Sequence, residues 1–240
     1  MPVLNFDKGK IELKNQEEKA KLTIYGEIVS TEWDKWEDED VAPKDIQDLL
    51  YQIGDKDLDI YINSVGGSVF AGMAIYNMLK RHKGVKNVYV DGVAASIASV
   101  IAMAGDNIYI PKNSFLMVHR AWCRISGNAD GLKKQAETLE ALDEGILNVY
   151  KAKLKDEADI EVIKSLISKE SWINGEEAHR YFNIEVTEAN EISASFDEEY
   201  CNIHDIPIEL KESLFIRNKK EKDVEEAVLA KKKLELELLI

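Results

Sequence analysis

Residues 59–79 read DIYINSVGGSVFAGMAIYNML, a stretch that predicts a strand, a turn and a helix in immediate succession. The run at 59–62 is typical of a buried strand, and apolar residues recur at helical spacing over 69–79. Gly66 and Gly67 stand between the two patterns, where adjacent glycines allow a sharp turn and a close approach of the backbone. The junction is therefore either an ordinary βα turn or a concavity of free N–H groups that binds an anion.

The same alternation continues on both sides of this stretch. Strands that alternate with helices of ten to twelve residues are typical of an α/β fold with a largely parallel sheet and right-handed crossovers. We expect one domain over 21–192, a poorly specified leader at 1–20, and a charged C-terminal extension at 193–240 that is helical or disordered. The further strand patterns lie at 22–25, 85–90, 108–110 and 115–118, and the further helical patterns lie near 43–53, 94–104, 128–155, 159–168 and 175–181.

Composition narrows the class of protein. The 240 residues are 45% hydrophobic and 32% charged, enough apolar material for a sizeable core and too much charge for a membrane-embedded chain. Lys and Arg number 31 against 45 Asp and Glu, and a net charge of −14 argues against binding to nucleic-acid phosphates. The two cysteines, Cys123 and Cys201, are too few for a disulfide framework. We therefore expect a cytoplasmic protein with neither a membrane nor a nucleic-acid partner.

A second junction, DGVAASIAS at 91–99, places Ser96 where a strand enters a helix. A hydroxyl there lies close to the unpaired N–H groups and the positive end of the helix dipole. This placement suits a nucleophile whose product is an oxyanion. The alternative is that Ser96 only caps the helix, a common role for serine, and the local pattern leaves both open.

The third feature is His119, which follows the apolar strand pattern at 115–118. A lone buried histidine is often structural, so His119 gains meaning only beside other groups. His82, His179 and His204 lie in a basic run, a polar helix and the tail, respectively. Neither zinc-ligand spacing, nor a Walker loop, nor a dinucleotide fingerprint occurs in the sequence. We expect no metal and no cofactor.

Taken in order, INSVGGSVFAGMAIYNML, DGVAASIASVIAMAGD and FLMVHRAW resemble the Clp protease proteolytic subunit (ClpP) family of self-compartmentalising serine peptidases. The resemblance runs from about Leu22 to Ile192 and is strongest to the ClpP-like peptidases of phages and prophages, which are taken to act in prohead or head maturation. It implies the ClpP/crotonase-like ββα spiral head with a long protruding handle helix, here at 128–155.

The resemblance also implies roles for individual residues. Ser96 would be the nucleophile and His119 its general base, with Glu170 at the position that usually holds the orienting aspartate. Gly67 and Ile97 would donate backbone N–H groups to the oxyanion hole. An extended substrate would pair as an added strand between two flanking segments, formed by Ser68, Val69 and Phe70 and by Ala121, Trp122 and Cys123.

The resemblance implies a homo-oligomer as well, with heptameric and possibly stacked rings enclosing the active sites. The substrate would be a polypeptide. Capsid or scaffold proteins, or a separate Clp ATPase, are the partners that the family suggests. The first 20 residues do not look like the family's axial gating loops, and the chain has no ATP-binding motif of its own.

Two other functions are compatible with the pattern. A crotonase-like acyl-CoA enzyme shares the spiral fold and a backbone oxyanion hole, but such enzymes typically use carboxylates and need no serine nucleophile. A catalytically silent ring or scaffold subunit would keep the same fold without using the serine and histidine.

Overall fold

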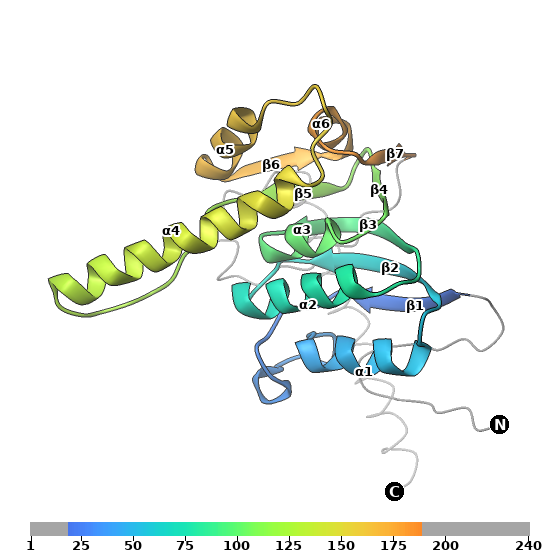
Figure 1. Cartoon of the computed structure of the whole chain (residues 1–240), viewed down its shortest axis with the longest axis horizontal. Helices are drawn as coiled ribbons and strands as arrows, with labels where there is room; N and C mark the ends of the chain where they lie inside the picture. Colours follow the sequence, from blue (N-terminus) through green and yellow to red (C-terminus); the bar gives the residue numbers. More distant parts are fainter. Residues whose placement is uncertain (1–18, 189–240) are drawn as a thin grey trace, which may run out of the picture. The chain divides into compact units, whose positions relative to one another are not determined.

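The computed structural model describes residues 19–188, which form a mixed α/β unit around a seven-stranded sheet (Figure 1). The main path of the sheet runs β1-β2-β3-β4-β7, and these strands are all parallel. The elements are β1 (Lys19–Ile24), η1 (Glu32–Asp34), α1 (Pro43–Ile53), β2 (Asp57–Ser64), α2 (Val69–Arg81), β3 (Lys86–Ala95), α3 (Ile97–Ala102), β4 (Asn107–Pro111), β5 (Phe115–Val118), α4 (Ala129–Lys151), α5 (Ile160–Ser168), β6 (Ser171–Asn174), α6 (Gly175–Tyr181) and β7 (Glu185–Thr187).

Strand β3 pairs with two neighbouring strands, one after the other along its length. Its first half pairs with β4, and its last residues, Val93 to Ala95, pair in parallel with β5. Strand β6 then adds antiparallel to the other side of β5. The sheet therefore branches at β3, and the residues that follow β3 and β5 emerge side by side at the same edge.

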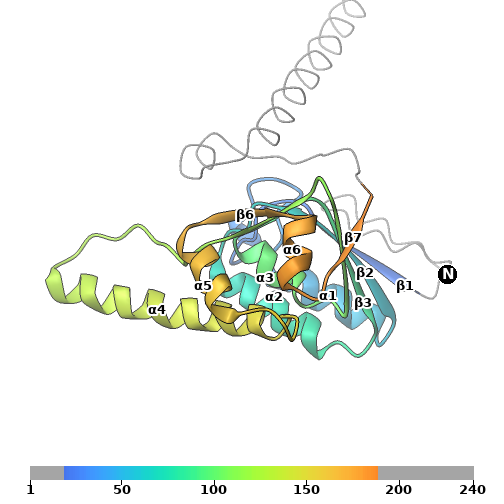
Figure 2. The ribbon, with the colours of Figure 1, turned by 90° about the horizontal axis from the view of Figure 1, so that it is seen from above.

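The two faces of the sheet differ in chemistry. Leu58, Ile60 and Ile62 of β2 are fully buried on the face that carries α1, α2 and α3 (Figures 1 and 2). On the opposite face, Tyr89 stacks between Tyr61 and Tyr109, with ring centroids 5.1 and 5.0 Å apart. This alternation is the period-two pattern of a strand with one face in the core, and it fixes the register of β2, β3 and β4.

Helix α4 is buried only near its C-terminal end, where Ile146, Val149 and Tyr150 reach the core. Its earlier turns extend away from the sheet (Figures 1 and 2). The prediction of a long protruding helix is confirmed, although the helix ends at Lys151 rather than at residue 155. None of the helices within residues 19–188 is long and apolar enough to cross a membrane.

The predicted α/β class is confirmed, and α1, β5 and α6 have the predicted bounds. The helix predicted from Ala94 is wrong at its start, because Ala94 and Ala95 still belong to β3 and pair with β5. Small apolar residues on all sides fit a buried strand as well as a buried helix, so periodicity could not place that boundary. The leader predicted over 1–20 ends too late, because Lys19 and Ala20 already belong to β1. Residues 1–18 and the predicted C-terminal extension, with Cys201 and His204, lie outside the described residues.

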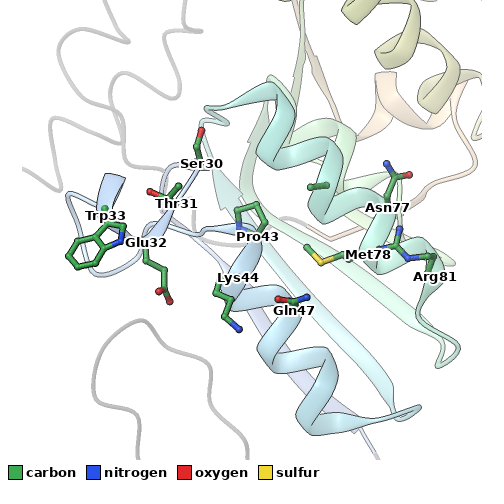
Figure 3. A pocket seen from close by; sticks show the side chains of 11 residues that line it. Ser30, Thr31, Glu32, Trp33, Pro43, Lys44, Gln47, Asn77, Met78 and Arg81 are labelled. Carbon is green, nitrogen blue, oxygen red and sulfur yellow. The ribbon is translucent and has the colours of Figure 1, made fainter.

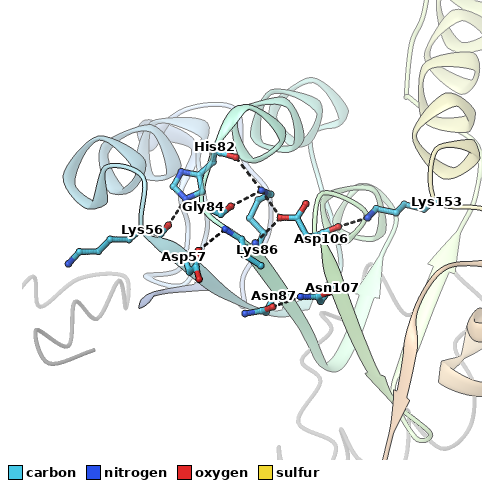
Figure 4. A network of polar contacts seen from close by, with 11 residues as sticks. Lys56, Asp57, His82, Gly84, Lys86, Asn87, Asp106, Asn107 and Lys153 are labelled. Carbon is cyan, nitrogen blue, oxygen red and sulfur yellow. Dashed lines mark hydrogen bonds and ion pairs between the residues drawn. The ribbon is translucent and has the colours of Figure 1, made fainter. Parts of the chain in front are cut away.

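An ion pair between a buried lysine and a partly exposed aspartate anchors the start of β3 (Figure 4). The side chain of Lys86 is 5% exposed, and its Nζ lies 2.8 Å from Asp106 Oδ2. The same ammonium donates to the carbonyl oxygens of Gly84 and His82. Burial alone would raise the pKa of the Asp106 carboxyl, but the hydrogen bonds and charge of Lys86 outweigh it and hold that pKa below its ordinary value.

The replacement Asp106→Asn should therefore destabilise the fold in a pH-dependent way. We expect a loss of about 2 kcal/mol in the free energy of unfolding at pH 7, because a buried ammonium loses its charged acceptor. A carboxyl with a depressed folded pKa contributes stability above its unfolded pKa of about 4 and loses it as pH falls further. Chemical denaturation of both proteins at pH 7 and pH 3 should show the difference shrink at the lower pH.

Asp55→Asn is the matched control, since Asp55 pairs with Lys83 at 3.2 Å through side chains that are 70% and 78% exposed. This change should cost less than about 0.5 kcal/mol. An equal loss in both variants, or a difference that does not vary with pH, would contradict this account of the Lys86 pair.

Candidate active site

The turn between β3 and α3 holds Ser96 in a strained conformation. Its φ is 53° and its ψ is −126°, a region that residues with a Cβ rarely adopt. The Ser96 N–H donates to the carbonyl of Met117 at 2.9 Å, so the neighbouring strand β5 fixes the turn. A sharp strand-to-helix turn of this kind presents a serine hydroxyl at the edge of a sheet, as nucleophile turns do in hydrolases.

The hydroxyl of Ser96 contacts an imidazole. Ser96 Oγ lies 2.7 Å from Nε2 of His119, a side chain that is 8% exposed. The register explains the contact, because Ala95 is paired with Met117, so Ser96 directly follows the end of β3 beside the end of β5, which His119 follows. Ser96 occupies the N-cap position of α3 but makes no cap bond through its side chain, so the structure does not support the capping alternative.

Glu170 approaches the other side of the imidazole. Its Oε2 lies 3.8 Å from His119 Nδ1, the distance of an ion pair once the ring carries a proton. Because β6 runs antiparallel to β5 and Ser171 pairs with Val118, the next pair in that register is Glu170 with His119. Glu170 also has a positive φ of 52°, the second non-glycine residue with left-handed backbone among residues 19–188. The geometry thus brings all three predicted residues to one place.

Of the two adjacent glycines, Gly66 packs directly on this turn and Gly67 packs on the backbone of Ile28. Gly66 has a φ of 97°, and a Cβ built on it would lie 2.8 Å from Ser96 Cβ and 3.1 Å from Ile97 N. Gly67 has a φ of 138°, and a Cβ there would lie 2.2 Å from the carbonyl oxygen of Ile28. Neither position has room for a side chain, and both conformations favour glycine.

Two backbone N–H groups remain at this junction. Ile28 bridges the glycine turn by donating to Gly66 O and accepting from Ser68 N, and this bridge does not use the N–H of Gly67. The N–H of Ile97 opens helix α3, where the first N–H groups have no intrahelical acceptor. These are the two groups that the sequence resemblance puts in an oxyanion hole.

The first predicted substrate segment flanks the junction at the start of α2. Ser68 is the N-cap residue of α2, its Oγ accepting from Ala71 N at 3.4 Å and from Ser30 Oγ at 3.0 Å. Val69 lines the pocket beside Ser96, and Phe70 is 70% exposed. The side chain of Ser68 thus has a structural task in addition to any contact with a substrate.

The second predicted segment follows His119. The N–H of Ala121 donates to Asp143 Oδ1 of α4 at 2.8 Å, so this donor is already engaged. Trp122 and Cys123 are exposed, and Arg124 lies over the Trp122 ring at 6.0 Å. Residues 119–128 belong to no strand of the described chain.

A small pocket of about 10 Å³, roughly the space of one water molecule, lies beside Ser96 and His119. Its remaining walls are mostly apolar and come from α2, α3, the segment after β5, and α4. Two of its lining residues, Ile146 and Tyr150, belong to the buried end of α4. The other wall residues are Val69, Ile97, Val100 and Ala121.

A second, wider hollow lies between η1, α1 and α2 (Figure 3). Its lining includes Glu32, Lys44 and Arg81 but no histidine, so it offers no imidazole to accept a hydroxyl proton. Within residues 19–188, no group of three or more His, Cys, Asp or Glu residues is placed to hold a metal ion. The pocket at Ser96 therefore carries the clearest chemistry.

Sequence reasoning missed two residues near the nucleophile. Ser99 and Tyr150 are fully buried, and their hydroxyl oxygens lie 2.7 Å apart. Helical spacing indicated that Tyr150 lies on a buried stripe, but no sequence signal revealed its hydrogen-bond partner 51 residues away.

Comparison with known proteins agrees with this geometry. A family model described as Clp protease matches residues 26–186. Over 99 residues the chain is 33% identical to the ATP-dependent Clp protease proteolytic subunit of Deinococcus radiodurans. That alignment covers 40% of this chain and 48% of the relative, so the chain spans about half the length of the curated relative that it matches. Because the family model covers well over half of its residues, the chain belongs to the Clp protease family.

Proposed function

We propose that the chain is a serine endopeptidase of ClpP type, with Ser96 as the nucleophile and His119 as the general base. The observation that carries this proposal is the 2.7 Å contact between Ser96 Oγ and His119 Nε2 on a strained strand-to-helix turn. A hydroxyl is a weak nucleophile until an adjacent base accepts its proton, and this contact supplies such a base.

The first half of the reaction forms an acyl-enzyme. His119 Nε2 accepts the Ser96 proton while Oγ attacks the carbonyl carbon of a peptide bond. The carbonyl oxygen becomes negative, and the N–H groups of Gly67 and Ile97 stabilise it. The C–N bond then breaks, and His119 gives its proton to the leaving amine.

The second half repeats these steps with water. His119 accepts a proton from a water molecule that attacks the acyl carbon, and then returns that proton to Ser96 as the carboxylate product leaves. Through both halves, Glu170 orients the imidazole and stabilises its protonated form, as the acid of a catalytic triad does. This role for Glu170 is supported by its 3.8 Å approach to His119 Nδ1.

We also propose how a polypeptide binds. The pocket beside Ser96 has mostly apolar walls, which favour an apolar side chain next to the cleaved bond. The segment after His119, which belongs to no strand of the described chain, suits an extended main chain that adds as a strand, between the segments 68–70 and 121–123.

A ring-forming homo-oligomer of heptameric, possibly stacked, rings is part of the proposal. Its support is the family and the exposure of apolar side chains on and before α4, with Leu132 43% and Ile125 51% exposed. A partner copy that covers them would remove apolar surface from water. Enclosure in a ring would restrict cleavage to unfolded or delivered chains.

The biological setting is the most specific part of the proposal. The resemblance to phage and prophage peptidases favours capsid maturation in a host cytoplasm, with capsid or scaffold proteins as substrates. A separate Clp ATPase is the alternative partner, since the relative from Deinococcus radiodurans is a subunit of an ATP-dependent protease. Incubation with capsid proteins, compared with incubation beside a Clp ATPase and an unfolded protein, would separate the two settings.

Neither competing function accounts for the contact at Ser96. An acyl-CoA reaction of the crotonase kind would not need a serine bonded to a histidine. A silent scaffold subunit would have no use for a strained serine, since such a conformation costs free energy of folding and persists only where the surrounding structure enforces it.

Replacement of the nucleophile tests the proposal. Ser96→Ala should lower the cleavage of an unfolded protein such as reduced casein by about 10⁴-fold or more, because the acyl-enzyme can no longer form. Ser114→Ala is the matched control, a buried serine whose hydroxyl donates to Asp91 O at 3.1 Å outside the site. Cleavage at the wild-type rate by Ser96→Ala would mean that this serine takes no part in catalysis.

A second test concerns the acid. Glu170→Gln keeps the shape but removes the charge, and we expect kcat to fall by about 10⁴-fold, as it does when the acid of a triad is replaced by its amide. Free imidazole titrates near pH 6.5, and the activity of the native protein should rise through the loss of that proton. The midpoint should move to lower pH in the variant, because a carboxylate favours the protonated ring and its removal does the opposite.

The control for this change is Glu176→Gln, an exposed glutamate in the first turn of α6. It should leave both kcat and the pH midpoint unchanged. If Glu170→Gln behaves in the same way, Glu170 is not the orienting acid.

A further inference from the structure

A series of hydrogen bonds that does not include His119 reaches the turn that carries Ser96. Ser99 is fully buried in α3, and its Oγ donates to the carbonyl oxygen of Ser96. The same Oγ lies 2.7 Å from Oη of Tyr150 on α4. The Ser99 N–H also donates to Ser96 O, at 3.1 Å.

The donors in this series can be assigned from chemistry. A carbonyl oxygen only accepts, so the single hydroxyl proton of Ser99 is directed to Ser96 O. The phenol of Tyr150 must then donate to Ser99 Oγ. Burial raises the pKa of Tyr150 by more than the hydrogen bond with Ser99 lowers it, so the phenol keeps its proton at working pH. The order is Tyr150 O–H, Ser99 O–H, Ser96 C=O.

This series of hydrogen bonds ends at the peptide unit that also carries one of the two N–H groups of the proposed oxyanion hole. The carbonyl of Ser96 and the N–H of Ile97 belong to one planar peptide unit. A plane held at its oxygen is also held at its N–H, and hydrogen bonds accepted by the oxygen strengthen the N–H as a donor. The left-handed backbone of Ser96 makes such support necessary, because this plane follows directly after the strained residue.

The local geometry of α3 explains the bond from Ser99 to Ser96 but not the bond from Tyr150 to Ser99. Serines inside helices often bond back to a carbonyl one turn earlier, and Ser99 does so here. That habit does not explain why Tyr150, 51 residues away on another helix, directs its phenol at the same hydroxyl. Tyr150 also lines the pocket beside Ser96, with its ring 5.8 Å from that of Phe182.

We propose that Ser99 and Tyr150 are positioning residues of the oxyanion hole, which act together to aim the Ile97 N–H at the developing negative charge. This inference rests on the proposed peptidase function. Neither residue touches the reacting atoms; each acts through the peptide unit that joins Ser96 to Ile97.

The test compares Tyr150→Phe, Ser99→Ala and the double variant in the full chain. Each single change should lower kcat on a fluorogenic peptide about tenfold, a fraction of what loss of a whole oxyanion donor costs. KM should stay within about twofold, because ground-state binding does not use the charge. The inhibition constant of a peptide boronate, whose tetrahedral adduct places an oxygen in the hole, should rise in proportion to the loss of kcat.

Two features separate positioning from general loss of structure. The double variant should be no slower than Ser99→Ala, because the two hydroxyls act in series. Ser114→Ala and Tyr76→Phe remove a buried serine hydroxyl and a half-buried tyrosine hydroxyl elsewhere, and both should keep wild-type kcat. Thermal unfolding of each variant shows whether it is folded. If Ser99→Ala is unstable, Tyr150→Phe still tests the inference, because it removes only a hydroxyl and keeps the whole ring.

Folded Tyr150→Phe or Ser99→Ala with wild-type kcat and boronate affinity would overturn the inference. An equal loss in Ser114→Ala would also overturn it, since the effect would then follow from any buried hydroxyl. A wild-type protein no more active than Ser96→Ala would refute the peptidase function itself, and the positioning role with it.

Discussion

The left-handed backbone of Ser96 is the constraint on which the site depends. A non-glycine residue in this conformation costs about 1–3 kcal/mol, and the surroundings must enforce it. Here a carbonyl of β5 accepts from the Ser96 N–H, and Gly66, which has no side chain, leaves room for the Cβ of Ser96. The helix that follows is fully buried. Gly72 of α2 lies under that helix, where an added Cβ would fall 2.2 Å from a side-chain carbon of Ile97. The double glycine and Gly72 are thus parts of one support.

The branch of the sheet at β3 gives this turn its partners. One strand pairs first with β4 and then with β5, so the chain leaves the sheet beside the end of β5. The antiparallel addition of β6 then places Glu170 in register with the residue after Val118. Three residues far apart in sequence meet because three strand registers converge, and the long helix α4 closes the pocket from the remaining side.

Much of this arrangement could be predicted from sequence, because the informative signals are local. Periodicity and spacing predict the strand–glycine–helix stretch at 59–79 and place the serine and the histidine after short apolar runs. The roles of these two residues, and of Glu170, come from the resemblance to a family. The end of β3 could not be placed, since Ala94 and Ala95 fit either a strand or a helix. Strands β6 and β7 are four and three residues long, too short for a recognisable period. The bond between Ser99 and Tyr150 depends on packing between two helices, which no spacing in the sequence encodes.

The central claim is that Ser96 is a hydroxyl activated by His119. Mass spectrometry of the protein after treatment with a fluorophosphonate tests this claim most directly, because such reagents form a stable bond with an activated serine. The account predicts a single adduct, mapped to Ser96 and absent from His119→Ala. An intact, folded protein that stays unlabelled, or an adduct on another hydroxyl with Ser96 untouched, would contradict it.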